Sequence, residues 1–299
     1  MTRVPSGARS SPFLLSATVH HHLHKSEEDY PQTAALLLRS FYVDDLVISV
    51  DTTADAEILY EETCQIFCNA GMKVKKWVTN DDTLLRRMFQ DSNASIESVT
   101  GQTKKVLGVI WDLQQDQLQC SLAAVSSSLE NEVTKRQVLQ TVSKIYDPLD
   151  LISPFSITGK ILFQGIWLAG LAWDDPLPED LKVTWDRWSA EVQELTELAV
   201  PRFINGPSSS AATMVHLFAG ASPVAYGALA YIETTSEDGG SCAEFLLSKS
   251  RVAPIKRQTL PRLELMAALL AARLYRFVCD ALEMQLDYVC WTDSSIVLH

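Results

Sequence analysis

The segment FYVDDLVISVD, residues 41–51, contains two short runs of β-forming residues, 41–43 and 46–50, on either side of an Asp-Asp pair. Two such runs around a short polar interruption are typical of a β-hairpin. The segment therefore predicts two short antiparallel strands joined by an acidic turn.

Helices and strands are both expected around this hairpin. Helical periodicity is found at residues 11–25, 31–39 and 54–70. Strand-like patterns follow at 72–78 (MKVKKWV), and at 106–112 and 118–122, which together predict a second hairpin. Strand, helix and strand in this order favour an α+β fold with helices on one face of a sheet.

The rest of the chain predicts a helical connector followed by a second α/β lobe. Residues 134–199 are mostly helical, with Thr134 as a cap. An apolar stripe at helical spacing is formed by Leu181, Trp185, Trp188, Val192 and Leu195. Residues 204–213 have the composition of a linker. Beyond it we expect strands at 214–219, 225–232 and 243–249, a helix at about 262–283 and a last strand at 287–292.

Composition limits the class of protein. The 299 residues are 47% hydrophobic and 21% charged, as in ordinary globular proteins. The net charge of −12 argues against a self-sufficient nucleic-acid binder, because such affinity comes mainly from basic residues. We expect no membrane span and no signal peptide. The six scattered cysteines indicate a reduced, intracellular protein, which predicts a cytoplasmic location.

The adjacent carboxylates Asp44 and Asp45 suggest a cation site. They repel each other, and a two-residue hairpin turn prefers Asn-Gly or Asp-Gly. Such a pair is explained when a divalent cation needs oxygen ligands, as in two-metal nucleotidyl transfer. The alternative is an exposed acidic turn.

Further motifs occur in a fixed order around YVDD. They are RVPSGARSSPFLLSAT (3–18), GMKVKKWVTND (71–81), VLGVIWD (106–112), TKRQVLQTVSKIYDPLDLISPF (134–155), LAWDDPLPEDL (171–181), LAVPRF (198–203), LPRLELMAALLAARL (260–274) and WTDSSIVLH (291–299). In sequence and order they resemble the Pol polyprotein of BEL/Pao-type LTR retrotransposons, over nearly the whole chain. The resemblance implies the C-terminal part of a reverse-transcriptase palm at 1–125, a helical connection at 126–203, a linker at 204–213 and a truncated RNase H-like α/β domain at 214–299.

The resemblance assigns polymerase roles to residues near the first hairpin. Asp44 and Asp45 would be catalytic, metal-binding carboxylates. Gly7, Tyr42 and Lys76 would line the nucleotide pocket, although a plain surface lysine is an equal reading of Lys76. A further palm aspartate would precede the first residue, so we expect no polymerisation by the isolated chain.

The resemblance also assigns RNase H roles. Glu264 and Asp293 match the second and third metal-binding acids of that site, while a helix-start glutamate stabilised by the helix dipole is the alternative for Glu264. Relatives have aspartate where this chain has Gly220, and the chain ends at His299 before the last acid. Asp150 also departs from the family, which has glycine there. We therefore expect no RNA hydrolysis.

Two spacings allow other sites. His20 and His24 are four residues apart and could share a metal, or they could be part of a surface or template-facing stretch. Cys64 and Cys68 have the same spacing, for which helix packing is the better explanation.

The sequence thus predicts a fragment of a retrotransposon polyprotein that resembles an RNA-directed DNA polymerase with an RNase H region, inactive as isolated. The implied cofactor is Mg²⁺ or Mn²⁺. The implied partners are an RNA or DNA template-primer and the missing polyprotein segments, in the cytoplasm or a virus-like particle. The alternatives are a catalytically dead nucleic-acid or protein interaction module and a relic that does not fold stably.

Overall fold

The computed structural model describes residues 7–90, 103–126, 133–192, 194–204, 212–236 and 239–298. The chain forms two compact units, residues 1–102 and 103–299. Most of the predicted linker at 204–213 lies outside the described residues, and the predicted domain boundaries stay predictions. Helices and strands are mixed throughout, which confirms the α+β class. No helix in the described part of the chain is long and apolar enough to cross a bilayer.

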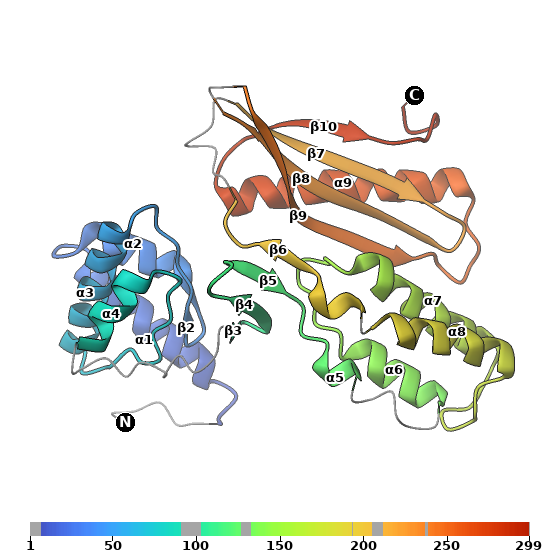
Figure 1. Ribbon diagram of the computed structural model, residues 1–299, viewed down its shortest axis with the longest axis horizontal. Helices are drawn as coiled ribbons and strands as arrows, with labels where there is room; N and C mark the ends of the chain where they lie inside the picture. Colours follow the sequence, from blue (N-terminus) through green and yellow to red (C-terminus); the bar gives the residue numbers. More distant parts are fainter. Residues whose placement is uncertain are drawn as a thin grey trace. The chain divides into compact units, whose positions relative to one another are not determined.

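The first unit consists of helices around one short hairpin (Figure 1). Leu23, Leu37 and Ile66 are fully buried and join three of these helices in one core. Pro12 and Pro31 lie in the first turns of their helices, where a missing N–H is tolerated. The elements are α1 (Ser11–Ser26), α2 (Pro31–Ser40), β1 (Phe41–Tyr42), β2 (Asp45–Leu46), α3 (Thr53–Asn69) and α4 (Asp82–Gln90).

Two predictions in this unit are wrong. Residues 72–78 form no regular strand, because Lys76 has a left-handed backbone, with φ of 62°, which interrupts the extended conformation. Trp77 packs instead edge-on against Tyr60, with ring centroids 4.9 Å apart. The hairpin is also shorter than expected, since residues 47–50 lie beyond its second strand.

The second unit begins with a small antiparallel sheet in the order β3-β4-β5-β6. The pairing of β4 with β5 confirms the second predicted hairpin. The stretch 106–112 is not one strand, however, because Leu107 and Gly108 both have positive φ and form a tight turn inside it. The strands are β3 (Thr103–Val106), β4 (Val109–Asp112), β5 (Gln117–Gln119) and β6 (Ala199–Pro201).

The helical connection follows β5. The Thr134 hydroxyl accepts a hydrogen bond from the Gln137 backbone N–H at 3.3 Å, which confirms the predicted cap. Trp185, Trp188 and Val192 of the apolar stripe are buried in the core of the connection. Its elements are α5 (Ala123–Ser126), α6 (Lys135–Ser143), α7 (Ser153–Leu168), α8 (Glu179–Glu191) and the 3-10 helix η1 (Glu194–Glu197).

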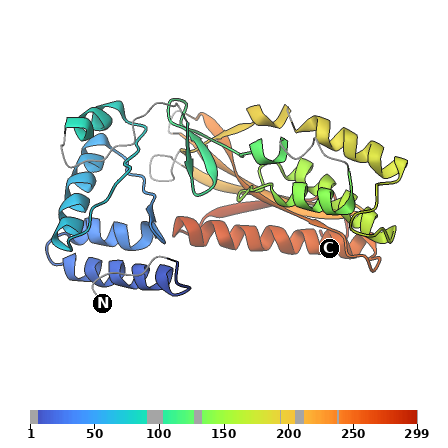
Figure 2. The same cartoon turned by 90° about the horizontal axis from the view of Figure 1, so that it is seen from below.

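A larger sheet, in the order β10-β7-β8-β9, completes the unit, and α9 lies along one of its faces (Figure 1 and Figure 2). Three strands are antiparallel, whereas β10 runs parallel to β7, so α9 serves as the crossover between sheet strands. The elements are β7 (Ala212–Ala221), β8 (Ala225–Thr235), β9 (Ser241–Val252), α9 (Leu260–Leu282) and β10 (Asp287–Trp291), close to the predicted ranges.

Asp150 attaches the connection to the outer edge of β9. The Asp150 carboxylate accepts a hydrogen bond from the Ser250 backbone N–H at 3.0 Å, and its backbone carbonyl accepts one from the Ser248 hydroxyl at 2.7 Å. The Ser248 N–H donates to the Leu149 carbonyl at 2.9 Å. Asp150 has φ of 53°, a left-handed conformation that glycine adopts more readily.

Candidate functional site

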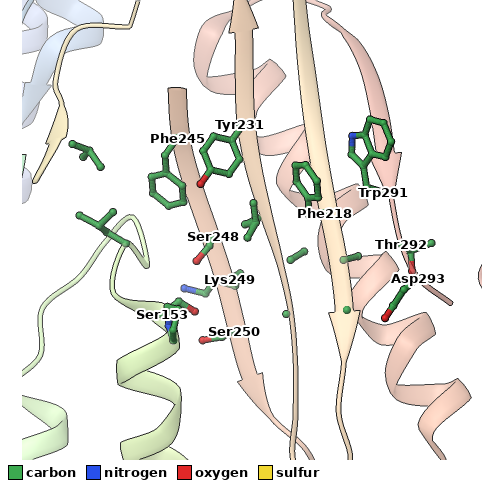
Figure 3. A pocket seen from close by; sticks show the side chains of 18 of the residues that line it. Ser153, Phe218, Tyr231, Phe245, Ser248, Lys249, Ser250, Trp291, Thr292 and Asp293 are labelled. Carbon is green, nitrogen blue, oxygen red and sulfur yellow. The ribbon is translucent and has the colours of Figure 1, made fainter. Parts of the chain in front are cut away.

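The predicted RNase H residues lie at one end of the larger sheet. The parallel register pairs Trp291 of β10 with Phe218 of β7. Two residues further along, Gly220 lies near the end of β7 and Asp293 follows β10, and both line the same cleft. Figure 3 labels Asp293 in this cleft. Asp293 is exposed.

Glu264 lies in the first turns of α9, next to this end of the sheet. Its carboxylate accepts a hydrogen bond from the hydroxyl of Ser294, the residue after Asp293, at 2.5 Å. Ser294 is 5% exposed and Glu264 is half-buried, so this contact is partly shielded from solvent. The structure thus brings Glu264 close to the segment that carries Asp293, as the sequence analysis expects for a common site.

Gly220, the position where the resemblance predicts a third acid, offers no ligand. A Cβ atom built on Gly220 has no atom within 4 Å, and the backbone there is not left-handed. The position therefore has room for a larger side chain, but glycine offers no oxygen. Among the described residues no three His, Cys, Asp or Glu side chains come together as a metal site. The residues present do not fit two divalent ions, which need a shared set of carboxylates.

The hairpin of the first unit presents its acids to solvent. Val43 and Asp44 form the two-residue turn, and Asp45 pairs with Tyr42 in the ladder. Asp44 and Asp45 are exposed, and Tyr42 is 67% exposed. Val43 has φ of 60°, which is costly for a β-branched residue. Strained turns occur where surrounding structure or function requires them.

Gly7 and Lys76 share an unusual backbone. Gly7 has φ of 82° with open space around its Cα, and Lys76 has φ of 62°. Both are exposed. Their proposed contacts with a nucleotide stay predictions.

Two of the four histidines of α1 have hydrogen-bond partners in the protein, and a metal shared by His20 and His24 stays a prediction. The His22 ring nitrogen Nε2 lies 2.7 Å from the Ile66 carbonyl oxygen, and His24 Nδ1 lies 2.7 Å from the Glu27 carboxylate. His22 therefore helps to pack α1 on α3.

An aromatic row lies on the face of the larger sheet opposite α9 (Figure 3). It consists of Trp291, Phe218, Tyr231 and Phe245, one from each strand. Successive ring centroids are 6.0, 6.2 and 5.7 Å apart. The row lines a cleft of about 870 Å³, whose opposite wall includes Leu151, Ser153 and Pro154 of the connection.

Trp291 is held in place by a hydrogen-bonded chain. Its indole N–H donates to His216 Nδ1 at 3.1 Å, so the proton of a neutral His216 must be on Nε2. That nitrogen lies 2.7 Å from the Glu233 carboxylate. The hydrogen bond from His216 is the main cause that lowers the pKa of Glu233.

A family model for the Pao retrotransposon-like RNaseH-like domain matches residues 134–294, more than half of the chain. The chain belongs to the Pao retrotransposon family. The match confirms the BEL/Pao-type resemblance. It spans the connection from α6 to η1, the larger sheet, Glu264, Asp293 and Ser294.

Solved structures resemble this Pao-family chain in fold. The foamy viral protease-reverse transcriptase in complex with double-stranded DNA matches with a TM-score of 0.53 and 16% identity, over 99% of this chain and 53% of that chain. A second foamy viral protease-reverse transcriptase structure with DNA, designated dRH, matches with a TM-score of 0.50 and 14% identity, over 99% of this chain and 44% of that chain. The Pao-family chain thus spans about half the length of these structures, and the likeness concerns fold alone. No curated protein matches.

Sequence reasoning missed Ser294 and the aromatic row of this Pao-family protein. Ser294 reads as an ordinary hydroxyl beside Asp293, and its contact with Glu264 depends on how α9 packs. A partial signal for the row exists, because residues 216, 218 and 220 alternate with buried Val215 and Leu217 and so share the outer face.

Proposed function

We propose that this chain is the palm, connection and RNase H-like region of a Pol polyprotein, and that it works on an RNA or DNA template-primer. Membership of the Pao retrotransposon family supports this proposal. The observation that supports it best is the Ser294–Glu264 hydrogen bond, because it ties Glu264 to the segment that carries Asp293 at one end of the sheet.

In the complete polyprotein, Asp44 and Asp45 would serve DNA synthesis, and Glu264 and Asp293 would serve removal of the RNA strand. Mg²⁺ or Mn²⁺ would neutralise the charge that develops on the transferred phosphate. In the described part of this chain no three His, Cys, Asp or Glu side chains gather as a metal site, whereas two divalent ions need a shared set of carboxylates. We therefore infer that the isolated chain neither extends a primer nor cleaves RNA.

A second candidate is an interaction module that binds a nucleic acid or a protein without turnover. Gly220 favours it, since the position most directly beside Asp293 has no ligand. The net charge of −12 limits affinity for phosphates in such a module, so a protein partner is compatible with it.

The test combines binding and turnover on one sample. The chain is incubated with a fluorescently labelled RNA–DNA hybrid and Mg²⁺, and anisotropy and gel electrophoresis report binding and cleavage. We expect binding without cleavage. If wild type produces RNA fragments and Asp293→Asn does not, the inference that the site is inactive is contradicted. If the chain binds no nucleic acid, the proposed function is refuted.

A further inference from the structure

The cleft beside the aromatic row has a flat aromatic part and a lower part made of small residues. Phe218 and Trp291 are 42% and 49% exposed, and their rings are nearly parallel, at 14°. Next to them, Gly220 pairs with Gly227, and Gly227 pairs with Ser250. The floor at this point is therefore close to the backbone, and a planar group can lie on it without meeting a side chain.

Polar groups are placed at the two ends of this floor. Asp293 lines the cleft beside Gly220, and Lys249 lines it beside the connection (Figure 3). The Lys249 side chain is 50% exposed, and its ammonium lies 3.9 Å from the Asp150 carboxylate. The Ser250 hydroxyl is buried and has no hydrogen-bond partner in the described part of the chain.

We propose that this cleft binds an unpaired nucleotide of a single strand, with its base stacked on Phe218 and Trp291 and its phosphate next to Lys249. A nucleotide combines a planar apolar base with an anionic phosphate, and the cleft offers aromatic faces and an ammonium in return. The inference rests on the proposed function, because it names which form of nucleic acid this face of the sheet takes.

The orientation of Trp291 favours stacking. The hydrogen bonds from Trp291 to His216 and from His216 to Glu233 fix the plane of the indole ring before any ligand binds. A ring that is already ordered loses less conformational entropy when it binds. Bases inside a duplex are stacked on one another, so an unpaired base is the form that can place its face on these rings.

The charges of the cleft predict an unusual salt dependence. Among the described residues that line it, Lys249 is the one with a positive charge. Each phosphate contact to a single strand contributes a slope of about −0.7 to the dependence of log affinity on log salt. Binding in the cleft is therefore expected to depend weakly on salt, with a slope of roughly −0.7.

The test uses the full chain and a short fluorescein-labelled oligothymidine, with affinity measured by anisotropy at several salt concentrations. Phe218→Ala and Trp291→Ala should each weaken binding by about 5- to 150-fold, as expected for the loss of one stacked base. Phe277→Ala is the matched control, since Phe277 is an exposed ring on α9, on the opposite face of the sheet, and should bind like wild type. Lys249→Gln should remove most of the salt dependence.

Each outcome decides the proposal. Wild type that does not bind oligothymidine, or alanine variants that bind it as wild type does, would overturn it. Where circular dichroism shows that an alanine variant is unfolded, the salt slope of Lys249→Gln decides instead, and an unchanged slope counts against the cleft. The RNA–DNA hybrid is titrated in parallel. If the hybrid binds and oligothymidine does not, the proposal for the cleft is refuted and the proposed function is not. If neither binds, both are refuted. A dimer in sedimentation that Phe218→Ala dissociates would assign the cleft to a second copy of the chain and overturn the proposal.

Discussion

The hydroxyl of Ser294 donates to the carboxylate of Glu264 across 2.5 Å and so joins the end of β10 to the first turns of α9. Two segments 30 residues apart in sequence are fixed together by this contact. As a result, Glu264 is held close to the segment of Asp293, and the neighbouring strand β7 carries Gly220, where the family resemblance predicts a third acid.

A single substitution tests whether a carboxylate at position 220 is enough to create a metal site. We expect Gly220→Asp to gain Mn²⁺ binding, because the position has open space for a carboxylate next to Asp293. In thermal or urea unfolding, Mn²⁺ at about 100 times its dissociation constant would stabilise the variant by about 2.7 kcal/mol. Gly220→Asn, which has nearly the same shape and no charge, is the control. Equal Mn²⁺ responses in wild type, Asp and Asn variants would contradict the prediction.

Asp150 is expected to contribute to the attachment of the connection to the sheet. Asp150→Ala removes the acceptor for the Ser250 N–H and keeps a side chain at φ of 53°. The free energy of unfolding should fall by about 1.5–3 kcal/mol, measured in urea. Asp150→Gly should lose less, since glycine adopts this backbone without strain. If both variants unfold like wild type, the carboxylate does not stabilise this junction.

The Asp116 carboxylate should make the stability of the fold depend on pH. Partial burial raises the pKa of Asp116, but hydrogen bonds from Arg202 and Trp111 outweigh burial and leave the pKa below its usual value of 3.8. A carboxylate whose pKa is lower in the folded state than in the unfolded state stabilises the fold at pH values above its unfolded-state pKa. This stabilisation is lost as the pH falls through the folded-state pKa. Asp116→Asn should therefore be less stable than wild type at pH 7, by about 1–2 kcal/mol. The difference should shrink below about pH 3.8. A difference that stays constant down to pH 3 would argue against the carboxylate as its source.

Two glycines of α7 should respond oppositely to alanine. A Cβ on Gly159 would lie 3.0 Å from the ring of Trp188, which is 3% exposed and stacked on Phe155 at 4.6 Å and so cannot shift. Gly159→Ala should destabilise the chain by about 1–2 kcal/mol. At Gly165 the nearest atom would be 3.8 Å away, an ordinary contact. Gly165→Ala should stabilise α7 by about 0.5–1 kcal/mol, as alanine favours helix. If calorimetry shows that both substitutions raise the melting temperature, or that both lower it, this account of the packing is wrong.

Local patterns predicted the elements whose periodicity is set by one buried face. The outer strands and the long helix of the larger sheet fall close to their expected ranges, because alternation and helical spacing both reflect burial against the same core. The pattern failed at 72–78, where alternating residues lie on an irregular backbone that turns at Lys76. It failed again at Leu107 and Gly108, where a two-residue turn is too short to interrupt an apolar run visibly.

The candidate site was less accessible to sequence reasoning. Adjacent carboxylates in a hairpin turn marked Asp44 and Asp45 as a possible cation site, and the family resemblance gave them a polymerase role. Glu264 and Asp293 were named through the resemblance alone, since a single acid looks like any surface charge. The contact between Ser294 and Glu264 and the row through Phe218 and Trp291 depend on helix docking and strand register. These are relationships between distant segments, and no local pattern encodes them.

The loop at Asp150 makes the two edge strands of the larger sheet, β9 and β10, differ in their surroundings. On β9, the outward N–H groups of Ser248 and Ser250 are already bonded to the Leu149 carbonyl and the Asp150 carboxylate, so an incoming strand finds no free donor at these two positions. The opposite margin is β10, whose Asp287–Trp291 segment pairs with β7 on one side. Pairing with another strand, whether in a partner or in an aggregate, is therefore blocked at this stretch of β9.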